Sequence, residues 1–134
     1  MEALIGVSLA LAVSLGASVV GLDRDRAFYP TVTIVIASLY GLFAVMGASN
    51  TALLLESLVA AAFVFVAILG FKKNLWFVVV ALALHGIFDL IHGQLISNPG
   101  VPSWYPIFCF AYDVVAAGYV AWLLGSSRRT ATTS

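Results

Sequence analysis

Residues 52–71 have the sequence ALLLESLVAAAFVFVAILGF, in which Glu56 is the one charged side chain. A helix needs about 20 apolar residues to cross the hydrocarbon core of a bilayer. This segment meets that length, and the polar residues Ser49–Thr51 and Lys72–Asn74 bound it. We therefore predict a transmembrane helix at 52–71.

Four further apolar segments of similar length flank this one. Turn-forming or charged residues separate them, including the uncharged loop from Ser97 to Ser103, whose Pro and Gly residues break a helix. The sequence thus predicts an all-α integral membrane protein, a single domain over residues 1–134 that is a bundle of five transmembrane helices. The predicted spans are 3–22, 28–48, 52–71, 75–95 and 105–124.

Composition favours the same class. The chain is 63% hydrophobic and 9% charged, whereas soluble domains carry about 25% charged residues. A soluble protein of 134 residues could not bury so much apolar surface. The formal net charge is zero, so nothing points to nucleic acid. Cys109 is the lone cysteine, which excludes an internal disulfide.

The positive charges predict an orientation. With five spans, all six Lys and Arg residues fall on one side, in the Arg24/Arg26 loop, the Lys72/Lys73 loop and the tail with Arg128 and Arg129. The positive-inside rule makes that side cytoplasmic and places the N-terminus outside. A signal peptide would carry its basic residues before the first apolar segment, so we expect the first span to be a retained helix. The expected membrane is a bacterial-type cytoplasmic membrane.

Ionisable side chains inside the predicted spans gather at one depth. At about 1.5 Å of rise per residue, all of them fall in the outer half of the bilayer. They are Glu56, His85, Asp89, His92 and Asp113. Charges at mid-span cost about 2.5–3.5 kcal/mol each, so such residues face the interior, pair with one another and mark function. We predict a site under the outer loop, with Glu56, Asp89 and Asp113 as its catalytic acids.

The spacing of His85, Asp89 and His92 places all three on one helical face. Histidine and carboxylate are ligands for zinc or iron, which predicts a metal site formed by His85, Asp89, His92 and Asp113. His85 and His92 lie roughly 10 Å apart along the axis, so they are not expected to bind one ion together. The alternatives are His85 with Asp89, or Asp89 with His92, completed from another helix.

Other interpretations of these residues stay open. Carboxylic acids in an apolar site can stay neutral and exchange protons with a lipid-soluble substrate without any metal, and the cluster can also simply hold helices together. Beside the cluster, Cys109 is more often a small buried hydrophobe. The loop over the cluster is interpreted as a lid or as a rigid interfacial turn. The candidate substrate-binding residues are Trp104, Tyr105, Cys109 and Tyr112.

Two further predictions concern the first span and the loop that follows it. The first span carries a ridge of small residues, including Gly6, Ala10 and Ser14, which allows a close helix approach within the molecule or, alternatively, a homo-oligomer contact. The loop from Asp23 to Arg26 is interpreted as solvated.

No known catalytic signature is present, so function is a hypothesis. The leading one is a membrane-embedded enzyme acting on a hydrophobic or lipid-like small molecule, with membrane lipid as its surroundings. The alternatives are a transporter of protons, metal ions or small solutes, and a structural subunit of a larger complex. The scarcity of ionisable groups in the inner halves of the spans counts against transport.

Overall fold

A computed structural model describes residues 1–126, and these residues form helices and connecting loops without strands. The five long helices are each apolar and long enough to cross a membrane. They are α1 (Glu2–Val20), α2 (Phe28–Met46), α3 (Asn50–Lys72), α4 (Trp76–Leu95) and α5 (Tyr105–Gly125). All five predicted spans are confirmed as helices, with ends that differ by no more than two residues. The Arg128/Arg129 tail and the predicted cytoplasmic C-terminus lie outside the described residues.

Local chemistry sets the helix ends. Gly21 ends α1 in the left-handed conformation, at φ 91°, which a residue without a Cβ adopts without strain. A short 3-10 helix, η1 (Leu22–Arg24), follows, and the sequence patterns did not predict it. Ser49 caps α3, because its hydroxyl accepts a hydrogen bond from the Ala52 amide.

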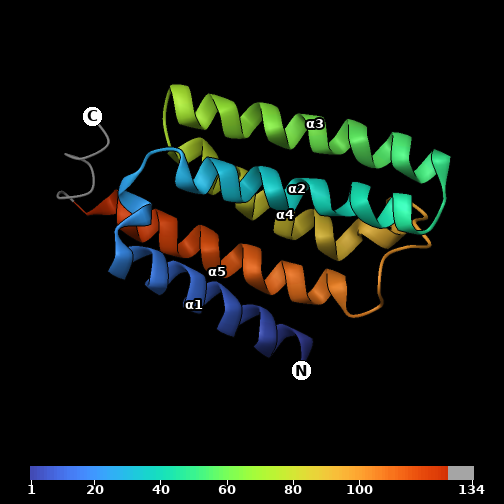
Figure 1. The fold of residues 1–134 in the computed structure, drawn as a ribbon, viewed down its shortest axis with the longest axis horizontal. Helices are drawn as coiled ribbons and strands as arrows, with labels where there is room; N and C mark the ends of the chain where they lie inside the picture. The colour runs from blue at the N-terminus through green and yellow to red at the C-terminus, as the bar shows by residue number, and fades with distance from the viewer. Residues whose placement is uncertain (127–134) are drawn as a thin grey trace.

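The helices form a bundle in which α5 occupies a central place. It packs between α1 and α4, while α2 pairs with α3, and α4 also contacts both α2 and α3 (Figure 1). Short connections make sequential helices run in opposite directions. The turn between α2 and α3 and the loop between α4 and α5 therefore lie at the same end of the bundle (Figure 1).

The small residues of α1 serve packing within the molecule. Gly6, Ala10, Ser14 and Ala17 are the buried residues of this helix, and α5 is its main partner. A Cβ at Gly6 would lie 2.3 Å from the Phe108 carbonyl oxygen, so only glycine permits this approach. The intramolecular role of the ridge is confirmed, and a homo-oligomer contact through the first helix stays a prediction.

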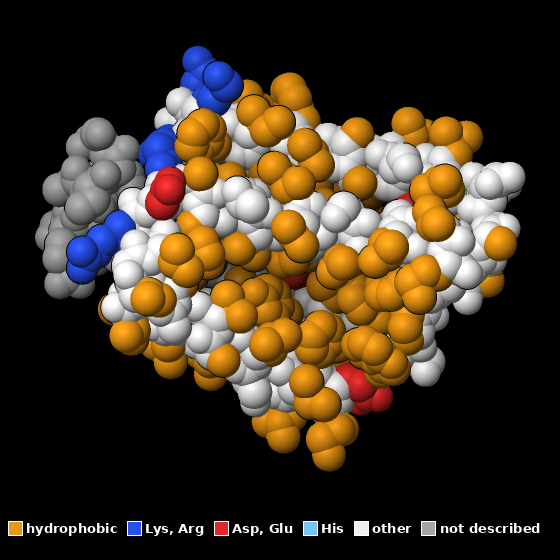
Figure 2. All heavy atoms as spheres, viewed as in Figure 1, with side chains coloured by type: hydrophobic (Ala, Val, Ile, Leu, Met, Phe, Trp, Pro, Cys, Tyr) orange, Lys and Arg blue, Asp and Glu red, His pale blue; other side chains and the backbone are white. Residues whose placement is uncertain are grey.

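The distribution of side chains is the reverse of that in a soluble protein. Large apolar side chains are exposed along every long helix, including Leu58 at 62% and Leu90 at 52%. Acids and histidines are instead among the most buried side chains. Figure 2 shows hydrophobic side chains over the visible face and Lys and Arg gathered at one end. This surface fits an integral, multi-pass membrane protein.

Candidate functional site

The face of α4 that was predicted from spacing points into the bundle. His85, Asp89 and His92 are each no more than 2% exposed, and so are Glu56 on α3 and Asp113 on α5. The burial of all five residues among packed helices agrees with the expectation for ionisable groups inside spans. The five residues do not form one cluster, however, but two adjacent groups.

The first group joins α4 to α5. The Nδ1 atom of His85 lies 2.7 Å from Asp113 Oδ2 and 3.6 Å from Asp89 Oδ2. The Cys109 thiol is 3.7 Å from Asp113 Oδ2. Gly86 makes this approach feasible, since even a Cβ there would lie 3.3 Å from Asp113 Cβ. Gly93, one turn from Asp89, has no such role, since a Cβ there would meet no atom within 4 Å among the described residues.

The second group joins α4 to α3. The Nε2 atom of His92 lies 2.5 Å from Glu56 Oε2, and Asn98 donates its side-chain amide to the same oxygen at 2.8 Å. His92 therefore pairs with Glu56 and not with Asp89, and of the two predicted pairings the structure contains His85 with Asp89. Glu56 Oε1 is buried and has no hydrogen-bond partner.

Tyr40 of α2 connects the two groups. Its hydroxyl donates a hydrogen bond of 2.7 Å to Asp89 Oδ1. Its ring stacks on the His92 imidazole with a centroid distance of 3.8 Å and an interplanar angle of 8°. The sequence did not single out Tyr40, because neither charge nor spacing relates it to the acids. The available signal was a lone phenol hydroxyl deep in a predicted span, where it needs a partner.

The loop between α4 and α5 covers the second group. Asn98 donates to the Tyr40 carbonyl oxygen as well as to Glu56, and its own side-chain oxygen accepts from the Gly100 amide. A Cβ at Gly100 would lie 1.7 Å from the Phe43 carbonyl oxygen, so the loop rests directly on the end of α2. The predicted position of the loop over the cluster is confirmed.

The candidate substrate-binding residues divide between the interior and the surface. Tyr105 and Cys109 are each 3% exposed, and the ring of Tyr105 packs edge-on against Tyr40. Tyr112 is half-buried. Trp104 is 49% exposed and contacts Tyr105 and Phe108 at the surface, away from the carboxylates.

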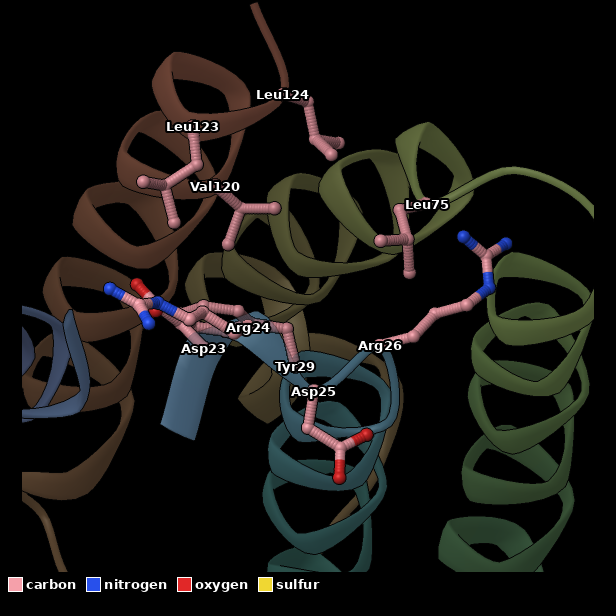
Figure 3. Close-up of a pocket in the computed structure, with 9 residues that line it drawn as sticks. All are labelled: Asp23, Arg24, Asp25, Arg26, Tyr29, Leu75, Val120, Leu123 and Leu124. Atoms are coloured by element: carbon pink, nitrogen blue, oxygen red, sulfur yellow. The ribbon is translucent and has the colours of Figure 1, made fainter. Parts of the chain in front are cut away.

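The opposite end of the bundle is less solvated than predicted. Asp23 is 8% exposed and accepts a hydrogen bond from Ser18, whose hydroxyl also lies 2.6 Å from that of Tyr119. Arg26 reaches the end of α3 (Figure 3), where its Nε donates to the Phe71 carbonyl oxygen at 2.6 Å. The interpretation of this loop as solvated holds for Arg24 and Asp25, which are exposed, and is wrong for Asp23 and Arg26. Asp23 accepts from the Ser18 hydroxyl, and Arg26 satisfies a carbonyl at the end of α3.

The charges of the site do not balance. Glu56, Asp89 and Asp113 would carry three negative charges if ionised, and His85 and His92 at most two positive ones. The Lys and Arg residues within 1–126 lie at the opposite end of the bundle (Figure 2). An uncompensated buried charge costs several kcal/mol, so the site requires either bound protons or a bound cation.

One set of ligand atoms is compact enough for a metal ion. One ligand atom from each of four buried residues lies within 4.8 Å of all the others, and the residues are His85, Asp89, Cys109 and Asp113. This group could hold a metal ion. His92 and Glu56 belong to the neighbouring group. No protein-family model, curated protein or solved structure matches the chain.

Proposed function

We propose that the chain is a membrane-embedded enzyme with its N-terminus outside and the Arg24 and Lys72 loops in the cytoplasm. The apolar surface and the gathering of basic residues at one end support this orientation. The expected membrane is a bacterial-type cytoplasmic membrane. Labelling with a membrane-impermeant maleimide tests the orientation. Ser103→Cys should react in intact cells, whereas Lys73→Cys should react only after lysis, and the opposite pattern would exclude it.

His85, Asp89 and Asp113 are the proposed ligands of a divalent metal ion, with Cys109 beside them. The observation that carries this proposal is the compact set of buried ligand atoms from His85, Asp89, Cys109 and Asp113. Zinc fits this set because it accepts nitrogen, oxygen and sulfur ligands in a tetrahedral site. Iron sites of the two-histidine, one-carboxylate type need a second imidazole, and His92 is instead paired with Glu56.

The second group supplies proton transfer in this proposal. A zinc ion held by His85, Asp89 and Asp113 would supply Lewis-acid chemistry to a water molecule or a substrate oxygen. Glu56 and His92 lie next to the ligand set, joined to it through Tyr40. A carboxylate that contacts an imidazole is an arrangement suited to general acid–base catalysis. The substrate is expected to be hydrophobic or lipid-like because the site lies among apolar helices.

Transport is the weaker candidate. Asp23 is buried at the opposite end, which the sequence did not predict, and it accepts a hydrogen bond from the half-buried Ser18. Between that end and the site, however, the helices present the buried apolar residues Ile36, Leu82 and Val120. A continuous polar route is therefore not favoured. The subunit hypothesis predicts instead that neutralising Asp89 leaves the activity of the host complex intact.

Metal content tests the ligand assignment. Protein purified without chelators should contain about one zinc per chain, and Asp113→Asn should lose most of it because a carboxylate ligand is removed. Asp25→Asn is the matched control, since Asp25 is an exposed acid at the opposite end. A metal-free wild-type protein, or equal loss in both variants, would refute the assignment.

Enzymatic activity is tested separately. Lipid extracts of cells that express the wild-type protein should contain a species whose amount changes relative to cells that express Asp113→Asn. Asp25→Asn should reproduce the wild-type profile. Identical profiles from all three strains by untargeted mass spectrometry would count against the enzyme and in favour of a structural subunit.

A further inference from the structure

A pocket opens at the outer end of the bundle, directly over His92. Its volume is about 290 Å³, close to the lower bound of about 300 Å³ for small-molecule sites. The last turn of α4 and the following loop line it, with His92, Asn98 and Ser103 among the polar residues. None of these loop residues was among the predicted substrate contacts.

The pocket leads to the proton-transferring pair of the proposed enzyme. His92 lines it and also contacts Glu56, while Asn98 lines it and donates to the same Glu56 oxygen. A ligand in the pocket would therefore reach His92 without displacing any of the proposed metal ligands.

The lining offers hydrogen bonds but no Lys or Arg side chain. Ser97 and Ser103 supply hydroxyl groups and Asn98 supplies an amide, whereas the remaining wall is apolar, including Ile96 and Val101. The lining itself contains no carboxylate, and His92 connects it to the buried Glu56. Phosphate recognition normally employs Arg or Lys, and the described Arg and Lys residues are all at the other end of the bundle.

We propose that this pocket binds the uncharged polar head, a hydroxyl or amide group, of a lipid-like molecule whose chain extends into the outer leaflet. This inference rests on the proposed function and specifies its substrate class. The lining offers no Lys or Arg to pair with an anionic phosphate head and no carboxylate to pair with a cationic head, whereas a neutral head can exchange hydrogen bonds with Ser97, Ser103 and His92.

A series of ligands with one chain length tests the head-group preference. The reporter is the rate at which a maleimide labels Ser97→Cys, an exposed position in the pocket wall. Dodecanol and dodecanamide should slow labelling about threefold at a ligand concentration of about twice the Kd, as mass action requires. Dodecyl phosphate and dodecyltrimethylammonium should not slow it. Lys73→Cys, at the opposite end, controls for effects of the ligands on the micelle.

A second substitution, Ser103→Lys, is added to the Ser97→Cys reporter. It predicts a gain of protection, so that a protein that has failed to fold cannot give the expected result. A cation at this exposed position should let dodecyl phosphate slow the labelling, which an unfolded protein could not do. Protection by dodecyl phosphate or by dodecyltrimethylammonium in the reporter without the lysine, or no protection by either neutral ligand, would overturn the inference. Metal content measured on the same preparations separates this result from failure of the proposed metal site.

Discussion

At the scale of single residues, the central feature is the role of Tyr40. Its hydroxyl bonds Asp89 in one group and its ring stacks on His92 in the other. The two functions can be separated, because phenylalanine retains the ring and lacks the hydroxyl. This separation distinguishes a hydrogen-bonded link between the groups from simple aromatic packing.

Tyr40→Phe should lower the free energy of unfolding by about 1.5–3 kcal/mol, the range for hydrogen bonds to charged groups. Tyr29→Phe on the same helix is the matched control, since the Tyr29 hydroxyl is buried and, among the described residues, makes no hydrogen bond comparable to that between Tyr40 and Asp89. Unfolding in mixed detergent micelles measures both variants. Equal losses would mean that the bond between Tyr40 and Asp89 contributes little.

Asp89→Asn removes one buried negative charge and keeps an oxygen that can accept from Tyr40. In metal-free protein, we therefore expect this variant to unfold at the same temperature as the wild type or at a higher one. Zinc at about 100 times its Kd should stabilise the wild type by about 2.7 kcal/mol and the variant far less. Thermal unfolding with and without zinc measures this, and equal stabilisation of both proteins would argue against Asp89 as a ligand.

At the scale of helices and loops, glycine determines how closely the elements approach. Gly6 lies against the Phe108 carbonyl oxygen, and Gly100 against that of Phe43. Both contacts hold an element that contributes to the site. The contact of Gly6 involves α5, which supplies Asp113, and Gly100 belongs to the loop that supplies Asn98. Two substitutions test these contacts separately.

Gly6→Ala should destabilise the bundle by about 1–3 kcal/mol, the usual cost of overpacking. Gly16→Ala on the same helix meets no atom within 4 Å and should be neutral, or stabilising by up to about 1 kcal/mol, because alanine favours helix. Unfolding free energies of the two variants decide the matter. A stable Gly6→Ala protein would show that α1 does not pack on α5 as described.

Gly100→Ala should lift the loop from the end of α2, since backbone atoms there cannot move aside cheaply. The amide of Gly100, bonded to Asn98, should then exchange its hydrogen faster than in the wild type. Gly118→Ala, which meets open space, should leave this exchange unchanged. Unaltered exchange in Gly100→Ala would mean that the loop is not held by this contact.

At the scale of the whole molecule, the sequence predicted much of the architecture. Hydropathy predicted five helices, and their directions predicted that Glu56, Asp89 and Asp113 lie at similar depths. In the structure, His85 lies beside both Asp89 and Asp113, and Glu56 contacts His92 on the same helix as Asp89. The pairing of Glu56 with His92 was not predictable, because it depends on the rotation of α3 against α4. Spacing along one helix determines which residues share a face, but not which neighbouring helix that face meets.

The roles of Tyr40 and Asn98 also depend on tertiary contacts. Both are neutral residues, and neither carries the cost of burial that drew attention to the acids. Asn98 lies in a loop that crosses the end of α2 at Gly100, which packs closely against Phe43 and Gly47. No local sequence pattern encodes that path. The small residues of α1 were recognisable from the sequence, whereas their partner α5 was not.

The central claim is that a metal ion binds among His85, Asp89 and Asp113. Anomalous X-ray diffraction at the zinc edge, on crystals of the wild-type protein purified without chelators, tests it most directly. We predict one peak per chain, within about 2.0–2.2 Å of the ligand nitrogen and oxygen atoms. Crystals that show no peak between α4 and α5, or a peak elsewhere in the molecule, would contradict the assignment.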